Sequence, residues 1–197
     1  MLLVANHVSW LDPFAINAVR PARFVAKSEV ARWPVIGWLA KCAGTLFVVR
    51  SRRHHTAQVN QRVAAAMRDG AAFAVFPEGT TTDGSVVLPF HASLLQPAFE
   101  SEALLMPVAL RYLRDDGSLC AEVAYDGDKS VWDTLLSMVS QPRIRAQLKF
   151  LPPLPPANHS HRRELAAVAQ QAITSALHLA APSMRAETTA GLQAATR

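Results

Sequence analysis

The chain has 197 residues, a formal net charge of +5, and 50% hydrophobic against 18% charged residues. This length fits one domain with a single core, and the apolar balance excludes a disordered chain and a densely charged nucleic-acid-binding tail. No run reaches the ~18 consecutive apolar residues of a membrane-spanning helix, and no secretory signal pattern is recognised.

Seven apolar segments rich in β-branched residues predict strands, at residues 2–5, 24–26, 46–49, 72–76, 105–110, 119–124 and 146–150. Between the first two, Asp12 and Pro13 predict a helix start, because Asp is a good N-cap and Pro fits the first turn. A second helix is predicted over residues 56–69, with Thr56 as its cap and Gly70 as its stop. Strands that alternate with helices predict an α/β, three-layer domain with a central mixed, largely parallel sheet flanked by helices.

Residues 1–181 are expected to form a single domain. Its segment 151–156, LPPLPP, predicts a stiff extended connector. Residues 157–181 then predict a C-terminal amphipathic helix that packs back on the domain. The remaining residues 182–197, rich in Ala and Thr, predict a flexible tail.

The first candidate for chemistry is residues 6–12, NHVSWLD, directly after the first predicted strand. Functional residues often follow a strand at this edge of a parallel sheet. If a turn folds the segment, His7 can donate a hydrogen bond to the Asp12 carboxylate, which makes the other ring nitrogen a general base. From the spacing alone, a structural histidine near a helix start is the commoner interpretation.

The second candidate is residues 76–84, FPEGTTTDG, again just past an apolar strand. Pro77 and Gly79 enforce a turn that holds Glu78 at the end of the strand. A carboxylate in that position can accept hydrogen bonds from the hydroxyl groups of a substrate. A polar loop between a strand and a helix is an equally good interpretation of the motif taken alone.

Two further blocks accompany these candidates. Residues 44–50, GTLFVVR, predict a strand that delivers Arg50, whose planar guanidinium suits phosphate recognition, unless it is simply a solvent-facing strand end. Residues 104–109, LLMPVA, predict an apolar strand whose Pro107 fits a sheet edge or a bulge.

In this order the four blocks resemble the glycerolipid acyltransferase family, typified by bacterial 1-acyl-glycerol-3-phosphate acyltransferases. His7 and Asp12 match its HX4D motif, residues 76–80 its FPEGT block, and residues 44–50 and 105–108 its other two blocks. The resemblance implies an O-acyltransferase of phospholipid or membrane lipid biosynthesis. Such an enzyme transfers a fatty acyl group from acyl-CoA or acyl-carrier-protein to the free hydroxyl of a lysolipid such as 1-acyl-glycerol-3-phosphate.

The same resemblance implies roles for individual residues. His7 would be the general base and Asp12 would orient it and stabilise its charged form, without an enzyme nucleophile, because the thioester donor is already activated. No cofactor and no metal are expected, since the remaining histidines, among them His54 and the His159/His161 pair, lack ligand spacing. The acceptor headgroup is expected to contact four residues, Arg50, Glu78, Gly79 and Thr80.

One departure from the family concerns the acceptor. Many members that act on phosphate-bearing acceptors have Arg after FPEGT, but here Thr81 occupies that position. A hydroxyl cannot replace a bidentate cation on a phosphate dianion. Together with the following residues, this resembles the lyso-ornithine-lipid acyltransferase branch, so this acceptor and lysophosphatidic acid both stay open.

A second departure concerns the membrane. Met1 lies six residues before His7, whereas family members usually carry an upstream anchor, so either the natural protein starts earlier or it binds the cytoplasmic face of the membrane peripherally. Residues 33–39, WPVIGWL, are a candidate contact with two Trp, although a buried core helix is the slightly preferred interpretation. Residues 1–68 carry ten Lys or Arg against two acidic residues, a charge of +8 that suits phosphate groups or anionic headgroups.

Other classes fit less well. A serine hydrolase is disfavoured because there is no GxSxG and Ser9 lies before a helix, and Cys42 has no neighbouring base. The two cysteines, Cys42 and Cys120, form no CxxC motif and suggest a reduced compartment. Nucleic-acid binding lacks a recognised module. A non-catalytic binder of lipid at the membrane surface remains a distant alternative, for which His7→Ala would leave binding untouched.

Overall fold

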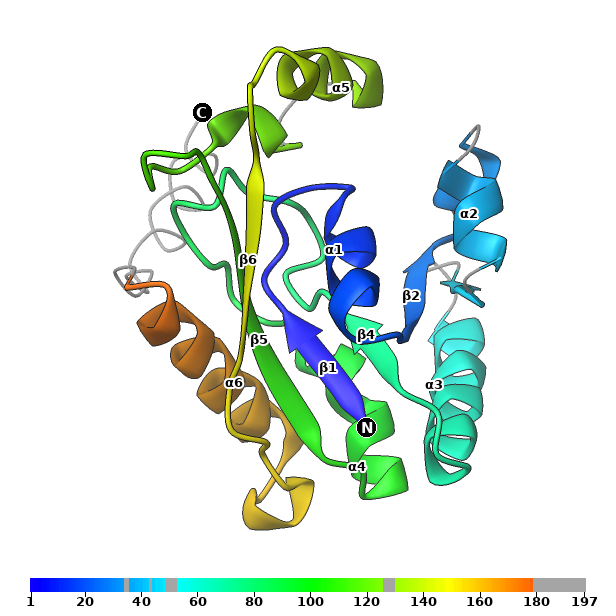
Figure 1. Cartoon of the computed structure of the whole chain (residues 1–197). Helices are drawn as coiled ribbons and strands as arrows, with labels where there is room; N and C mark the ends of the chain where they lie inside the picture. The colour runs from blue at the N-terminus through cyan, green and yellow to red at the C-terminus, as the bar shows by residue number, and fades with distance from the viewer. Residues whose placement is uncertain (34–35, 43, 49–52, 126–129, 179–197) are drawn as a thin grey trace, which may run out of the picture.

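The computed structural model describes residues 1–33, 36–42, 44–48, 53–125 and 130–178. They form three layers, with a sheet between two layers of helices (Figure 1). The strands are β1 (Leu2–Ala5), β2 (Arg23–Lys27), β3 (Leu46–Val48), β4 (Phe73–Val75), β5 (Leu105–Leu113) and β6 (Arg145–Phe150). The α-helices are α1 (Asp12–Val19), α2 (Ile36–Cys42), α3 (Arg53–Arg68), α4 (Gln96–Ser101), α5 (Val131–Val139) and α6 (Arg162–Ala176).

The sheet has the order β3-β2-β4-β1-β5-β6, in which the first five strands are parallel and β6 is antiparallel to β5. The predicted fold, a mixed and largely parallel sheet flanked by helices, is therefore confirmed. Strand β1 lies at the centre, with Leu3 level with Ala74 of β4 and with Met106 of β5. Because parallel strands share one direction, the loops that follow β1 and β4 emerge at the same edge.

The two faces of the sheet bury different sets of residues. Leu2 and Val4 of β1 face the side covered by α3, α4 and α6, and Leu3 and Ala5 face the side covered by α1 and α5. This alternation is the period-two geometry of a strand. Both faces of β1 are buried, which explains why its sequence is a continuous apolar run rather than an alternating pattern.

The predicted strand at residues 119–124 is wrong. Leu119 makes only an isolated bridge to Leu113, and residues Ala121–Val123 form a 3-10 helix. The buried residues here are Cys120, Val123 and Ala124, a spacing of three and four that is helical rather than alternating. Their apolar character is therefore a consequence of packing onto the sheet and not of strand pairing.

Helix boundaries also differ from those predicted. Helix α3 begins at Arg53, so Thr56 is not its cap, and α6 occupies Arg162–Ala176 within the predicted span 157–181. Helices α4 and α5 were not predicted. The predicted tail at 182–197 lies outside the described residues.

The proline-rich segment 151–156 continues from β6 alongside β5. Leu151 donates a backbone hydrogen bond to Pro107, and Leu154 exchanges two with Leu105. Leu105 pairs with Leu154, and Val108 pairs with Phe150. The two residues of β5 are three positions apart, but their partners are four positions apart, so the partner segment carries one extra residue. Pro107 therefore lies beside a bulge in the interior of the sheet rather than at its edge.

Candidate active site

The two specific motifs meet where β1 and β4 end. Residues 6–12 follow β1, and residues 76–84 follow β4, its parallel neighbour. The Asn6 side chain fixes the first loop, because it donates to the Leu110 carbonyl (2.9 Å) and accepts from the Leu110 N–H (2.8 Å). Thr82 of the second loop donates its N–H to the His7 carbonyl (2.9 Å). The sheet thus brings together segments about 70 residues apart in the sequence.

His7 and Asp12 lie in contact, as the resemblance to the HX4D motif implies. His7 Nδ1 lies 2.7 Å from Asp12 Oδ2. The same oxygen accepts the backbone N–H groups of Val8 (2.7 Å) and Ser9 (3.0 Å), and Asp12 Oδ1 accepts the hydroxyl of Tyr112 (2.8 Å). Asp12 is completely buried. These hydrogen bonds hold the Asp12 side chain in one orientation.

Asp12 is not the N-cap that the sequence predicts. It is the first residue of α1, the flanking residue Leu11 makes no side-chain cap, and the carboxylate turns back toward the preceding loop. Its carboxylate accepts hydrogen bonds from two backbone N–H groups of that loop and lies against the imidazole. It therefore does not reach forward to cap the N–H groups of the first helical turn.

The imidazole of His7 is positioned from two sides. Its ring stacks on Phe76, with centroids 4.1 Å apart and planes 11° apart, and Phe76 stacks in turn with Phe24. The side chain is 21% exposed and lines a cavity. Since Nδ1 is engaged by Asp12, Nε2 is the nitrogen that is left to face a reacting group.

Glu78 is buried between the His7 loop and the segment around Leu88. It is 4% exposed, and its two oxygens accept the backbone N–H groups of His7 (2.7 Å) and Leu88 (2.8 Å). Burial raises its pKa to about 7, although these hydrogen bonds and the nearby His7 oppose the rise. The carboxylate joins the His7 loop to the Leu88 segment, and its contact with an acceptor headgroup stays a prediction.

The raised pKa of Glu78 predicts a pH dependence of stability. Between the ordinary value of 4.5 and about 7, the folded protein holds a proton that the unfolded chain has released, so the free energy of unfolding falls as the pH rises through this window. The total decrease is on the order of 3 kcal/mol. Urea unfolding from pH 4.5 to 8 measures it.

Glu78→Gln removes the titrating group and should flatten the stability curve over the same window. Glu100→Gln, at an exposed position, is the control and should keep the wild-type slope. A slope in Glu78→Gln equal to that of the wild type would contradict the assignment.

A cavity of about 480 Å³ opens beside His7, with a mostly apolar wall. Gly79, Thr80 and Thr81 line it, so two of the predicted acceptor contacts lie beside the imidazole. Gly79 has φ of 76°, a conformation that favours glycine. The hydroxyl of Thr81 donates to the Tyr125 carbonyl. Arg50, the remaining predicted contact, lies outside the described residues.

Aromatic residues form part of the cavity wall. Trp10, Trp33 and Tyr125 line it, and Trp33 packs edge-on against Tyr125 with centroids 6.1 Å apart. Trp10 Nε1 is buried and has no hydrogen-bond partner among the residues that the structure describes. The sequence did not identify Tyr112 or Tyr125 as site residues, because each reaches the site only through the folding of β5 and the loop after it.

The predicted core helix around Trp38 is only partly correct. Helix α2 is present, but the Trp38 side chain is 66% exposed, so it is not a core residue. The charged residues on either side of this segment, Arg32 and Lys41, are also exposed.

Other candidate chemistry finds little support in the geometry. Ser9 is fully buried and its Oγ accepts the N–H of Leu11 (3.3 Å). Burial raises the pKa of the Cys120 thiol, which lies 3.3 Å from Glu122. No group of three or more His, Cys, Asp and Glu side chains in the described part of the chain is arranged to hold a metal ion. Over the same residues, no helix has the length and apolarity to cross a membrane.

Fold and site together define an α/β domain with a histidine–carboxylate pair beside an apolar cavity. Residues 1–111 match the family model described as Acyltransferase, and the chain belongs to this family. It is 40% identical to the lyso-ornithine lipid O-acyltransferase of Pseudomonas aeruginosa, over 90% of this chain and 67% of that protein. It is 38% identical to a 1-acyl-sn-glycerol-3-phosphate acyltransferase of Neisseria gonorrhoeae, over 77% of this chain and 59% of that protein.

The fold has a counterpart among solved structures. The 1-acyl-sn-glycerophosphate acyltransferase PlsC of Thermotoga maritima superposes with a TM-score of 0.63 at 22% identity, over 90% of this chain and 65% of that one. The chain thus spans about three-fifths to two-thirds of the length of these proteins.

Proposed function

We propose that this chain catalyses transfer of a fatty acyl group from a thioester donor to the hydroxyl of a lysolipid, in membrane lipid biosynthesis. The observation that carries this proposal is the His7–Asp12 pair at the wall of a largely apolar cavity. The imidazole supplies a base, and the cavity offers a surface for a lipid. The names of the relatives support the same reaction class.

The mechanism follows from the orientation of the imidazole. His7 Nε2 takes the proton of the acceptor hydroxyl as its oxygen attacks the thioester carbonyl carbon. The resulting tetrahedral intermediate collapses, the C–S bond breaks, and the imidazolium returns the proton to the leaving sulfur. Asp12 keeps the proton of the neutral imidazole on Nδ1 and stabilises the imidazolium. The products are an ester and a free thiol.

Two acceptors remain in the proposal. The lysophosphatidic acid assignment is supported by the Neisseria relative, and the lyso-ornithine lipid assignment by the Pseudomonas relative. Thr81 favours the second, because its hydroxyl is bonded to the Tyr125 carbonyl and gives the cavity wall no cation at this position. The donor is proposed as acyl-CoA or acyl-carrier-protein, and no further cofactor or metal is proposed.

The proposed location is the cytoplasmic face of a membrane, since the acceptor and the product are both membrane lipids. Contact would be peripheral or through an additional anchor. A non-catalytic lipid binder is the distant alternative, in which the apolar cavity would serve binding alone.

The test of this function offers two acceptors side by side. Labelled acyl-CoA and acyl-carrier-protein are each incubated with lysophosphatidic acid or lyso-ornithine lipid, and the acylated product is identified by mass spectrometry. We expect ester formation with one acceptor at least tenfold faster than with the other, because a wall that lacks a cation at position 81 discriminates against a phosphate dianion. A folded protein that binds both lipids and acylates neither would leave the lipid-binding alternative.

A further inference from the structure

Helix α5 presents an apolar face to solvent. Trp132, Leu136 and Val139 are 66, 57 and 75% exposed, and their spacing of four and three places them on one side of the helix. A surface helix of a globular protein normally turns its polar side outward. Three large exposed apolar side chains on one face are typical of a surface that meets a partner.

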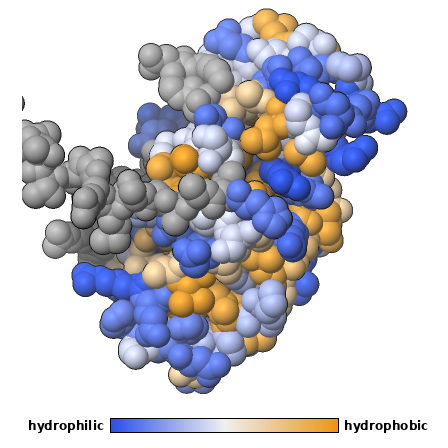
Figure 2. Space-filling view, turned by 90° about the vertical axis from the view of Figure 1, so that its left-hand side faces the viewer, coloured by the Kyte–Doolittle hydropathy of each residue, from blue (hydrophilic) through white to orange (hydrophobic). Residues whose placement is uncertain are grey.

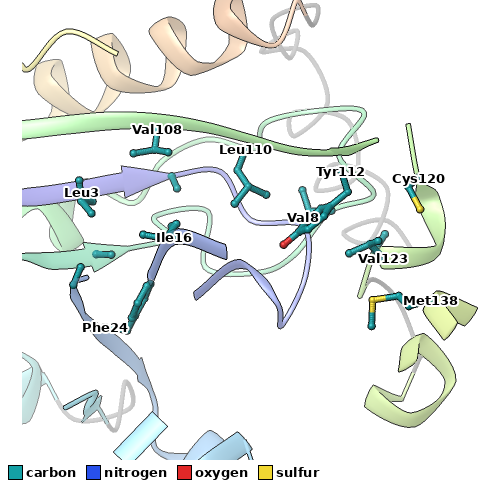
Figure 3. Close-up of a cluster of buried hydrophobic side chains, with 14 residues drawn as sticks. Leu3, Val8, Ile16, Phe24, Val108, Leu110, Tyr112, Cys120, Val123 and Met138 are labelled. Atoms are coloured by element: carbon teal, nitrogen blue, oxygen red, sulfur yellow. The ribbon is translucent and has the colours of Figure 1, made fainter. Parts of the chain in front are cut away.

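The opposite side of α5 is anchored in the core. Met138 packs in the same cluster as Val123, Tyr112 and Val8, which Figure 3 shows near one another. Ser130 and Asp133 form a capping box at the start of the helix. The outer face is therefore held rigidly by its own inner contacts, and its exposure is not the result of a poorly placed helix.

Few charged residues belong to this helix, and two arginines follow it. Asp133 is the only charged residue of α5, and its carboxylate is bonded to the Ser130 hydroxyl (2.7 Å) and N–H (3.1 Å). Two exposed arginines, Arg143 and Arg145, follow the helix. Arg143 also lies 3.6 Å from the exposed Asp115, a pair that solvent screens strongly. An exposed apolar helix face followed by exposed arginines suits contact with an anionic lipid surface.

The position of α5 links this face to the cavity. Tyr125 lines the cavity, donates its N–H to the Val8 carbonyl (2.9 Å), and lies shortly before α5 in the sequence. In Figure 1, α5 and α2 both lie toward the upper end, beyond the arrowhead of β1, and α2 carries the exposed Trp38. Figure 2, which faces the side away from α2, shows apolar residues among hydrophilic ones at its upper end. Trp side chains favour the headgroup level of a bilayer.

We infer that the outer face of α5, formed by Trp132, Leu136 and Val139, docks on a bilayer that contains anionic lipids. The three side chains enter the boundary between headgroups and acyl chains, and Arg143 and Arg145 meet the headgroups. This orientation brings the edge that bears His7 to the surface in which a lysolipid resides. The inference rests on the proposed function for that lipid substrate, but it makes a separate claim about the surface.

Vesicle binding tests the inference directly. Co-sedimentation with vesicles of phosphatidylcholine and phosphatidylglycerol compares the wild type with Trp132→Ser and with the triple variant Trp132→Ser/Leu136→Ser/Val139→Ser. We expect affinity to fall roughly tenfold in the single variant and further in the triple variant, since each side chain loses its transfer from water. The matched control is Leu104→Ser, which is 41% exposed and precedes β5 at the other edge of the sheet, and it should bind like the wild type.

Several outcomes would overturn the inference. One is equal vesicle binding by the wild type and the triple variant when near-ultraviolet circular dichroism shows both to be folded. Another is a wild-type dimer that the triple variant converts to a monomer without a change in vesicle binding, which would assign the face to a second copy of the chain.

An activity measurement separates this inference from the proposed function. Transfer to a short-chain lysolipid dissolved as monomers, without vesicles, should be the same in the wild type and the triple variant. Absence of transfer in the wild type, together with vesicle binding that depends on α5, would reject the proposed function and retain the docking surface. Loss of monomer turnover in the triple variant alone would reject a docking role.

Discussion

Replacement of His7 by Ala is expected to lower kcat/KM for acyl transfer by about 10²–10⁴-fold, the range that a positioned general base contributes. The side chain lines the cavity, and Nε2 is its only ring nitrogen not engaged by Asp12. No other His lines the cavity wall among the residues that the structure describes. Rates are measured with saturating acyl donor and varied lysolipid.

The fold should survive this substitution. Asp12 keeps its hydrogen bonds from Val8, Ser9 and Tyr112, so the buried carboxylate is not left without donors. His91→Ala is the matched control, because that imidazole is exposed and does not line the cavity. Retention of more than a tenth of wild-type kcat/KM in His7→Ala would exclude His7 as the base.

Asp12→Asn is expected to lower kcat/KM by about 10²–10³-fold with little loss of structure, because it removes the charge and retains the shape. The amide oxygen can accept from Val8, Ser9 and the imidazole, while the amide nitrogen donates to the Tyr112 hydroxyl. The loss is therefore the stabilisation of the imidazolium that forms during proton transfer.

The control is Asp69→Asn, at an exposed position, which should leave kcat/KM unchanged. A wild-type kcat/KM in Asp12→Asn would contradict a role for the carboxylate in the reaction.

The sequence predicts the central part of the fold because its local and global signals agree there. Residues 2–5 are a continuous apolar run, and the structure places them as the central strand, buried on both faces. The His7–Asp12 contact was expected from the resemblance to the HX4D motif, whereas the spacing alone did not distinguish it from a structural histidine near a helix start.

The features that the sequence did not predict depend on distant partners. Tyr112 is 100 residues from Asp12, and no local pattern connects them. The two hydrogen bonds that Glu78 accepts from the backbone N–H groups of His7 and Leu88 were also not predicted, because they depend on the path of the chain near Leu88. Helix α5 was not predicted because apolar residues lie on both of its sides, Met138 in the core and Trp132 and Leu136 in solvent, which obscures the pattern of a single buried face.

The central claim is that the chain couples thioester cleavage to ester formation, with His7 as the base. The most direct measurement follows released thiol and newly formed ester in one reaction containing acyl-CoA and the preferred lysolipid. The account predicts one thiol for each ester, no free fatty acid above background, and loss of both products in His7→Ala. Release of thiol with free fatty acid and no ester would show hydrolysis instead, and would contradict the account.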